Sequence, residues 1–338
     1  MSADLLVKKD NLVEVTDLRK WFPVQKGVLS TLAGGNLDYI HAVDGVSFHI
    51  RRGEVFGLAG ESGSGKSTIG RCVIGMEKPT KGQVCFDDTD LSTMSQEHLR
   101  RLRRRMQVIY QDPLASLNPR MLIGEAIMQG LQIHYPNRVA EHRALVMEMI
   151  ERVGLTPPEF FLNKFPHQIS GGQRQRVVIA RALITRPDLV LADEPIAMAD
   201  VSVRALLLDL MIRLKNDFNL TYLFITHDLA TAKYICDRIG ILYLGKLVEV
   251  GDLREVYAHP LHPYTQALLA AVPTPDPHKR RTALMPPGEI PNPINPPSGC
   301  RFHPRCPFAT EQCARQEPVL RELRPGHWVA CDYAERFM

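Results

Sequence analysis

The sequence lacks the features that mark membrane-spanning and exported chains. It contains no run of about 18 apolar residues, the length that a membrane-spanning helix requires. Residues 1–11 carry charges where a signal peptide needs an apolar segment. The net charge of +4 is too small to indicate nucleic-acid binding by itself. We therefore expect a cytoplasmic chain that binds no nucleic acid and needs a partner if it works at a membrane.

Closely spaced cysteine pairs are also missing. Structural zinc sites usually contain a C-x₂₋₄-C pair, and none is present. Four cysteines nevertheless gather near the C-terminus, with five, six and seventeen residues between them: Cys300, Cys306, Cys313 and Cys331. In a cytosolic protein such a group indicates a metal more than disulfides. Zinc, a [4Fe–4S] cluster and plain thiols are the alternatives that the spacing leaves open.

Length and composition predict a soluble protein with two domains. A chain of 338 residues is long for one domain, and a hydrophobic content of 45% supports a large core. The 23% of charged residues is ordinary for a soluble protein.

Residues 60–68 match the phosphate-binding pattern G-x-x-x-x-G-K-[ST]. A short buried strand is expected before them, at residues 54–59, and a helix after them, at residues 69–74. In that setting the glycines let successive N–H groups face a polyphosphate, and the helix N-terminus adds partial positive charge. The lysine would reach the β- and γ-phosphates and the serine hydroxyl would ligate Mg²⁺. The predicted nucleotide-binding residues are Gly60, Glu61, Ser62, Gly63, Ser64, Gly65, Lys66, Ser67 and Thr68.

Apolar patterns predict alternating strands and helices along the rest of the chain. Strands are expected at residues 12–15, 42–50, 82–86, 108–110, 189–193 and 222–226, and further helices at 144–153, 177–184 and 203–216. Continuous apolar strands separated by helices favour a parallel sheet covered on both faces. Residues 27–39 are interpreted as a surface loop. The arginine-rich run at residues 100–105 is interpreted as a solvated helix face, with a nucleic-acid or lipid-headgroup site as the alternative.

The C-terminal part predicts a separate region. Residues 259–264 open a helix that runs to about residue 271. Residues 273–299 then contain nine prolines, which predicts an extended, semi-rigid linker. We expect a nucleotide-binding domain at residues 1–258, with a helical insertion at about 91–169. A C-terminal extension at 259–338 would contain the linker and a four-cysteine region at 300–331.

A second motif supplies two adjacent carboxylates. The apolar strand at residues 189–193 places Asp193 at the carboxyl edge of the sheet, where it can bind Mg²⁺ through water. Glu194 follows one residue later and points elsewhere, so it is the candidate general base that polarises the attacking water.

Residues 170–176, with the sequence SGGQRQR, resemble the signature motif of ABC-type ATPases. With the two motifs above, the resemblance covers about residues 10–255. It implies an α/β fold: a RecA-like core, an antiparallel β subdomain and a helical insertion, here with a small cysteine-containing C-terminal domain. Ser170, Gly171, Gly172 and Gln173 would bind the γ-phosphate of ATP on an opposing subunit, because a helix N-terminus favours anions.

The same resemblance assigns roles to further residues. Gln111 would contact Mg²⁺ or the attacking water and connect ATP occupancy to the helical insertion. His227 would hydrogen-bond the γ-phosphate, and Asp200 would lie in the loop that faces the opposite site. The adenine would stack on Phe22, with Trp21 as the alternative. One departure is Ala197-Met198-Ala199, which stands where the family usually has Ser-Ala-Leu and lacks the serine hydroxyl.

Further patterns indicate which ABC protein this chain resembles. Only 104 positions separate Lys66 from Ser170, too few for a long coiled coil, and the motif set occurs once. Residues 259–269, 296–302 and 305–307 are similar to segments of dipeptide and oligopeptide importer ATPases. The resemblance implies an ATPase that powers peptide uptake. Oligosaccharide or nickel import, or a cytosolic non-transport ATPase, are the alternatives.

That resemblance also implies partners and a location. The chain would pair with a second copy or a paralogous ATPase subunit and dock on two integral-membrane permease subunits. An extracytoplasmic solute-binding protein would act with them indirectly, and the chain would lie at the cytoplasmic face of the cell membrane as a peripheral protein. Since some relatives with this cysteine set carry a [4Fe–4S] cluster, iron–sulfur becomes the favoured interpretation of the four cysteines.

Overall fold

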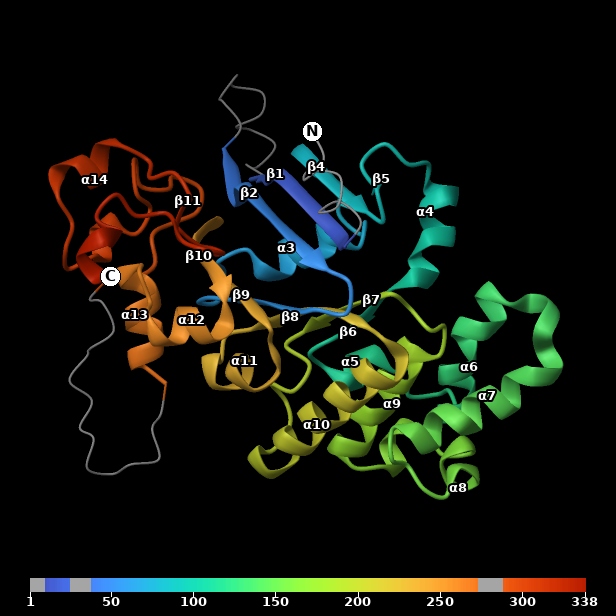
Figure 1. The fold of residues 1–338 in the computed structure, drawn as a ribbon. Coiled ribbons are helices and arrows are strands. Elements are labelled where there is room, and N and C mark those ends of the chain that lie inside the picture. The colour runs from blue at the N-terminus through green and yellow to red at the C-terminus, as the bar shows by residue number, and fades with distance from the viewer. Residues whose placement is uncertain (1–9, 25–37, 273–287) are drawn as a thin grey trace. The chain divides into compact units, whose positions relative to one another are not determined.

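The computed structural model describes residues 10–24, 38–272 and 288–338 (Figure 1). The predicted loop at 27–39 therefore lies almost wholly outside the described residues, as does the first part of the predicted linker. The chain divides into two units. Unit 1 contains the described residues of Met1–Leu12, Ile50–Val55 and Thr93–Ile225. Unit 2 contains those of Val13–His49, Phe56–Ser92 and Thr226–Met338.

An antiparallel sheet forms the N-terminal part of unit 2. Its order is β2 (Tyr39–Arg51), β1 (Asn11–Pro23), β4 (Lys81–Phe86) and β5 (Thr89–Asp90). Val13 lies opposite Phe86 and Val15 opposite Val84, so apolar residues pair across one face. The strands predicted from alternating residues are thereby confirmed, although β1 and β2 are longer than expected.

The phosphate loop of unit 2 lies between β3 (Val55–Ala59) and α3 (Lys66–Val73). β3 pairs in parallel with β9 (Arg238–Tyr243), and β9 pairs antiparallel with β10 (Lys246–Asp252). β3 is buried at all five positions, which explains its continuous apolar sequence. Two further helices, α11 (Leu229–Ile235) and α12 (Leu253–Ala258), flank β9 and β10 along the chain.

The C-terminal extension continues the same sheet. β12 (His327–Val329) pairs with β10, and β11 (Arg321–Arg324) pairs with β12. The extension also contains α13 (Pro263–Ala270) and α14 (Glu311–Arg315), drawn in orange and red in Figure 1. The sequence patterns predicted none of the strands β9 to β12. The extension is therefore attached by strand pairing as well as by side chains.

Buried Glu249 on β10 makes the polar part of that attachment. Its carboxylate accepts hydrogen bonds from the backbone N–H groups of Leu261 at 2.7 Å and His262 at 3.0 Å. It also lies 2.7 Å from Nε2 of His327. His262 caps α13 by accepting the N–H of Tyr264 at Nδ1. Burial lowers the pKa of His262 to about 4, with Glu249 opposing the shift, so this imidazole is neutral near pH 7.

Unit 1 contains a parallel sheet in the order β8 (Thr221–Thr226), β7 (Leu189–Asp193) and β6 (Met106–Ile109). Leu189 lies opposite both Met106 and Thr221. Its helices are α4 (Gln96–Leu102), α5 (Pro113–Ser116), α6 (Ile123–His134), α7 (Val139–Arg152), α8 (Pro158–Leu162), α9 (Gly171–Leu183) and α10 (Val201–Phe218). Helices α6, α7 and α8 lie within the residues of the predicted helical insertion and pack on one another, with α6 and α7 also contacting α9 (Figure 1). Parallel pairing of the strands near residues 108, 190 and 223 is confirmed.

Short 3₁₀ segments complete the described elements: η1 (Arg103–Arg105), η2 (Pro136–Arg138), η3 (Pro166–Gln168), η4 (His303–Arg305) and η5 (Ala334–Phe337). The arginine run at residues 100–105 spans the end of α4 and η1. Arg101 pairs with Glu97 at 2.6 Å, and Arg105 pairs with Asp188. Arg104 lies over the ring of Tyr135. Three arginines of this run therefore contact other side chains of the chain.

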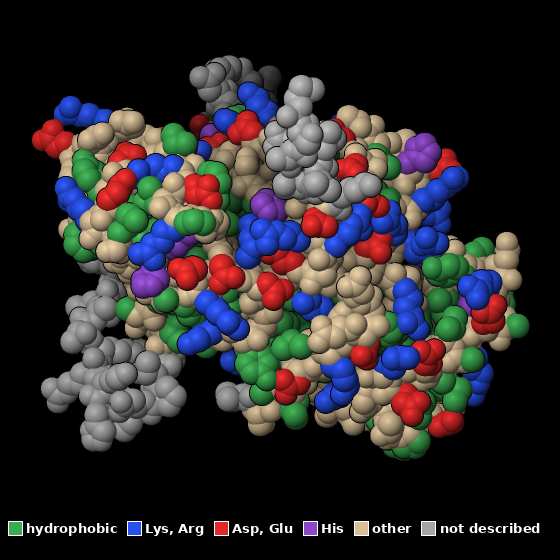
Figure 2. Space-filling model, viewed as in Figure 1, with side chains coloured by type: hydrophobic (Ala, Val, Ile, Leu, Met, Phe, Trp, Pro, Cys, Tyr) green, Lys and Arg blue, Asp and Glu red, His purple; other side chains and the backbone are tan. Residues whose placement is uncertain are grey.

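Charged side chains of both signs are interspersed on the face shown in Figure 2, in line with the small net charge. Among the residues that the structure describes, no helix has both the length and the apolar character needed to cross a bilayer.

Candidate functional site

The phosphate loop has a backbone that only glycine allows at two positions. Gly60 and Gly65 adopt φ angles of 151° and 105°. A Cβ atom would lie 2.1 Å from the carbonyl oxygen of Leu242 at Gly60, and 2.2 Å from that of Ala42 at Gly65. These distances are far below any real contact, so the loop packs directly against the backbone of β2 and the end of β9. The predicted role of the glycines in curling the loop agrees with this packing.

Lys66 is buried within the curl of the loop. Its ammonium donates to the carbonyl oxygens of Gly60 at 2.7 Å and Glu61 at 2.9 Å, and lies 3.4 Å from Oγ of Ser64. These acceptors place the one buried charge of the loop at its centre. Ser62 and Gly63 at the tip are exposed. A polyphosphate that approaches the tip would meet both the ammonium and the N–H groups of the turn.

Helix α3 begins at Lys66 itself, three residues earlier than predicted. Its N-cap is Gly65, which has no side chain to accept from the first N–H groups. There is no acidic residue in the first turn. The N-terminal dipole therefore faces the loop without a neutralising carboxylate, which favours an anion. Ser67 and Thr68 lie in this first turn, as the motif requires.

Two residues of the C-terminal extension contact the loop at Glu61. Oη of Tyr264 accepts the N–H of Glu61 at 2.9 Å. The guanidinium of Arg305 donates to both carboxylate oxygens of Glu61, at 2.8 and 3.1 Å. The sequence analysis missed both residues, because no local pattern indicates that a side chain 244 positions away contacts a loop.

In unit 1, the two predicted carboxylates leave the end of β7. Asp193 is the last residue of the strand, and Glu194 follows with a left-handed φ of 48°. The N–H of Glu194 donates to the carbonyl of Ile225 at 3.0 Å, which stabilises this turn. Nε2 of Gln111 lies 3.3 Å from the Glu194 carboxylate. The structure thus brings Gln111 and Glu194 together.

The signature residues form the N-terminus of α9, and this corrects the helix boundary. The helix was expected from residue 177 but begins at Gly171. Ser170 is the N-cap: its Oγ accepts the N–H of Gln173, whose side chain accepts the N–H of Ser170. This reciprocal capping explains the early start. Ser170 and Gly171 are exposed, and a Cβ at Gly171 would meet no atom within 4 Å.

Asp200 is the N-cap residue of α10, after the segment that departs from the family pattern. Backbone hydrogen bonds shape this segment, from Ala197 N–H to Glu194 and from Ala199 N–H to Ile196. Met198 is 66% exposed, so the residue at the centre of the departure faces solvent. The turn therefore forms without the serine hydroxyl.

The remaining predicted residues lie in unit 2. His227 is exposed and follows β8, just before α11. Phe22 lies near the end of β1, with Nζ of Lys20 4.8 Å from its ring centroid. The neighbouring Trp21 ring packs against His41 at 4.7 Å. Phe22 stays the predicted adenine-stacking residue.

The predicted site residues thus fall into two groups. Unit 2 contains the phosphate loop, Phe22 and His227. Unit 1 contains Gln111, Asp193, Glu194, the signature residues and Asp200. Each group is internally consistent with nucleotide chemistry: an anion-binding loop in one, and a carboxylate with a positioning amide in the other.

Comparisons with known proteins agree with these features. Residues 43–197 match the family model described as ABC transporter, and residues 248–313 match that of the oligopeptide/dipeptide transporter C-terminal region. The chain is 46% identical over 328 residues to the oligopeptide transport ATP-binding protein AppF of Bacillus subtilis, covering 96% of this chain and 97% of that one. It is 42% identical over 320 residues to the dipeptide transport ATP-binding protein DppF of Haemophilus influenzae, covering 95% and 96%.

A solved structure is similar over the larger part of the chain. It is a dimeric ATP-binding cassette in a post-hydrolysis state, bound to ADP and Pi. The likeness has a TM-score of 0.61 at 29% sequence identity, and covers 72% of this chain and 99% of the other.

The close packing of Gly65 allows a test of whether this loop binds the nucleotide in the described conformation. We expect Gly65→Ala to weaken binding of MgADP by at least about tenfold, or about 1.4 kcal/mol, since the added Cβ must displace the loop from Ala42. Isothermal titration of the isolated chain measures this affinity. Gly171→Ala is the control, because its Cβ meets nothing and its proposed ligand is a γ-phosphate on another subunit, so the isolated variant should bind MgADP like the wild type. Unchanged MgADP affinity in folded Gly65→Ala would contradict the assigned loop geometry.

Proposed function

Because the chain belongs to the family of ABC transporter ATP-binding subunits of the oligopeptide and dipeptide type, we propose that it hydrolyses ATP to power peptide uptake. The main support is that the chain combines a tightly packed phosphate loop with a C-terminal region that matches the oligopeptide/dipeptide transporter family model. The predicted family resemblance and fold class are confirmed. Peptide is favoured over the oligosaccharide and nickel alternatives because the relatives are named as ATP-binding proteins of oligopeptide and dipeptide transport.

Residues of the phosphate loop would bind the nucleotide. Lys66 and the N–H groups of the turn contact the β- and γ-phosphates, while Phe22 stacks on the adenine. Ser67, Asp193 and Gln111 are the residues proposed to ligate Mg²⁺, which neutralises phosphate charge when bound. Oxygen donors of this kind suit Mg²⁺.

Glu194 would act as the general base on the attacking water. Glu194 has a left-handed backbone just beyond the end of the strand, and we assign the two adjacent carboxylates different tasks. Gln111 positions the carboxylate through the contact at 3.3 Å. His227 would hydrogen-bond the γ-phosphate and preserve this arrangement during reaction.

The signature residues would complete a site on another subunit. Ser170, Gly171, Gly172 and Gln173 lie at an exposed helix N-terminus, which favours an anion brought by a partner. Asp200 begins the next helix and would face the opposite site. The similar solved cassette is dimeric, which supports pairing of two ATPase subunits here, and we propose that they pair head to tail. The second subunit is either another copy of this chain or a paralogue.

The remaining partners follow from the importer role. Two integral-membrane permease subunits would dock on the helical insertion, and an extracytoplasmic solute-binding protein would deliver peptide to them. The chain would then be peripheral at the cytoplasmic face of the membrane. ATP-driven closure of the ATPase pair would move the insertions and change the access of the permease.

We also propose that the four C-terminal cysteines bind a [4Fe–4S] cluster, with zinc as the alternative. Among the described residues, no group of three or more His, Cys, Asp or Glu side chains has the geometry to hold a metal ion. The proposal is supported by other observations. All four thiols are free, and the N–H of Cys300 donates to the carbonyl of Cys313.

Anaerobic purification with iron and sulfide analysis tests this cluster. We expect a coloured protein in which iron and acid-labile sulfide accompany the chain. Replacing Cys313 by serine should lower the iron content, whereas Cys85→Ser, outside the extension, should not. A colourless, iron-free protein would eliminate the iron–sulfur proposal.

Glu194→Gln tests the general-base role. The amide keeps the size of the side chain but cannot accept a proton, so MgATP binding should persist, stable dimers should accumulate and turnover should fall by about 100-fold or more. Turnover is measured as phosphate release, and dimers by size exclusion. Glu311→Gln, at an exposed helix of the extension, is the control and should hydrolyse normally. Unimpaired hydrolysis by Glu194→Gln would remove the assignment.

A further inference from the structure

The contact between Glu61 and Arg305 is a nearly buried, two-pronged ion pair. Their side chains are 17% and 6% exposed. Both terminal nitrogens of the guanidinium donate to the carboxylate, a geometry that a lysine cannot reproduce. An ion pair this buried resists screening by salt and orients both groups strongly. Arg305 thereby sets the orientation of the second residue of the phosphate loop.

The backbone of Glu61 connects these contacts to Lys66. Its N–H donates to Tyr264, and its carbonyl accepts from Nζ of Lys66 at 2.9 Å. The extension thus contacts the side chain and the N–H of Glu61. The carbonyl of Glu61 contacts Lys66. A shift of Glu61 would move an acceptor that positions the Lys66 ammonium.

A rigid aromatic cluster lies behind these contacts. The ring of Tyr243 meets those of Tyr264 and Phe302 at 4.7 and 5.2 Å, both edge to face. Tyr264 and Phe302 are buried almost completely. Oη of Tyr243 also accepts from Arg305 at 3.4 Å. Since fully packed aromatic side chains have little conformational freedom, this cluster restricts the positions of Tyr264 and Arg305 beside the loop.

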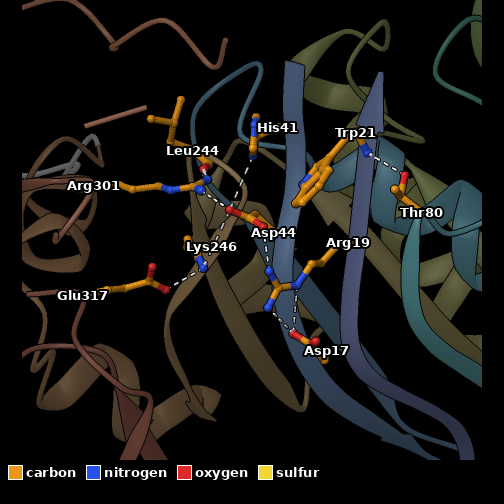
Figure 3. Close-up of polar contacts among 10 residues, drawn as sticks. All are labelled: Asp17, Arg19, Trp21, His41, Asp44, Thr80, Leu244, Lys246, Arg301 and Glu317. Atoms are coloured by element: carbon orange, nitrogen blue, oxygen red, sulfur yellow. Dashed lines mark hydrogen bonds and ion pairs between the residues drawn. The ribbon is translucent and has the colours of Figure 1, made fainter. Parts of the chain in front are cut away.

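A second arginine reaches the loop through a neighbouring turn (Figure 3). Arg301 donates to the carbonyl of Leu244 and to the carboxylate of Asp44. Gly245, which follows Leu244 in the chain, donates its N–H to the carbonyl of Ser64 in the phosphate loop at 2.8 Å. The turn that Arg301 stabilises is therefore hydrogen-bonded directly to the loop.

Asp44 is the buried counter-charge of this second contact. Burial alone would raise the pKa of Asp44, but the surrounding Lys246, Arg301, His41 and Arg19 outweigh it and lower the pKa. Figure 3 shows these side chains converging on its carboxylate. Lys246 is paired in turn with Glu317 of the extension at 2.5 Å. Asp44 is thus ionised and oriented by groups from several segments.

The four-cysteine region determines where both arginines lie. Arg301 follows Cys300 and Arg305 precedes Cys306, and the short η4 turn connects them. Within it, His303 N–H donates to the carbonyl of Cys300 and Arg305 N–H to that of Phe302, both at 2.9 Å. Any rearrangement of this turn would withdraw both arginines together.

We propose that the C-terminal extension positions the phosphate loop, with Arg305 as the positioning residue for Glu61 and hence for Lys66. Nucleotide affinity of this chain is then coupled to the folded state of its four-cysteine region. The inference rests on the proposed function of residues 60–68 as the phosphate site. The residues that bring about the coupling are all in unit 2.

A double-mutant cycle on MgADP affinity tests the coupling. The full-length chain is titrated calorimetrically as wild type, Arg305→Gln, Glu61→Gln and the double variant. We expect each single change to weaken affinity roughly tenfold and the double variant to lose no more than the worse single one, because both remove one interaction. Arg305→Lys, which keeps the charge but not the two-pronged geometry, should recover only part of the loss.

Arg315→Gln is the matched control. Arg315 pairs with Glu311 on the surface of the extension, where both side chains are exposed. It should leave MgADP affinity unchanged. In the assembled ATPase, Arg305→Lys should raise KM for ATP and leave kcat near the wild-type value, a split that general destabilisation does not produce. If Arg305→Gln does not fold, Glu61→Gln and Arg305→Lys decide the question.

Additive losses in the cycle, or folded variants whose affinity stays within about twofold of the wild type, would overturn the proposal. A wild-type chain that binds no MgADP would instead contradict the phosphate-loop assignment, so the two failures are distinguishable.

Discussion

The close packing of the phosphate loop against neighbouring backbone is the constraint on which the rest of unit 2 depends. At Gly60 and Gly65 there is no room for a single methyl group, because the carbonyls of Leu242 and Ala42 occupy that space. The loop can therefore curl around Lys66 only if β2, β9 and the turn after β9 keep their positions. Those positions depend in turn on Asp44, Arg301 and the strand pairing of the extension.

The residues proposed to bind and hydrolyse the nucleotide are divided between the two units. Unit 2 provides the anion-binding loop, and unit 1 provides the carboxylates, the positioning glutamine and an exposed helix N-terminus. A loop with buried cation and uncapped N–H groups binds phosphate by itself, but it contains no general base. Hydrolysis therefore requires groups that the loop does not contain, and we propose that Glu194 and a partner's signature residues supply them.

Much of this site was predictable from sequence, because its parts are local. A phosphate loop, a strand that ends in Asp193-Glu194 and a capped signature helix each depend on residues that are close along the chain. The start of α9 was placed too late, since the periodicity begins at residue 177 whereas the Ser170–Gln173 capping box starts the helix earlier. Strands β9 to β12 were not predicted; β11 and β12 have only four and three residues, and β12 pairs with β10 across about 80 positions. Arg305 and Tyr264 were beyond prediction for the same reason: their roles are set by distant tertiary contacts and not by neighbours in sequence.

The central claim, that the phosphate loop and the C-terminal extension are one cooperative structure, is tested most directly by native-state hydrogen exchange on the wild-type chain. The informative amides are those of Glu61, Gly245 and Cys300, which donate to Tyr264, Ser64 and Cys313. If the account is right, all three exchange through the same opening, with equal free energies and equal dependence on denaturant. If Cys300 exchanges through a separate, lower-energy opening while Glu61 and Gly245 stay protected, the extension unfolds without disturbing the loop and the account is wrong.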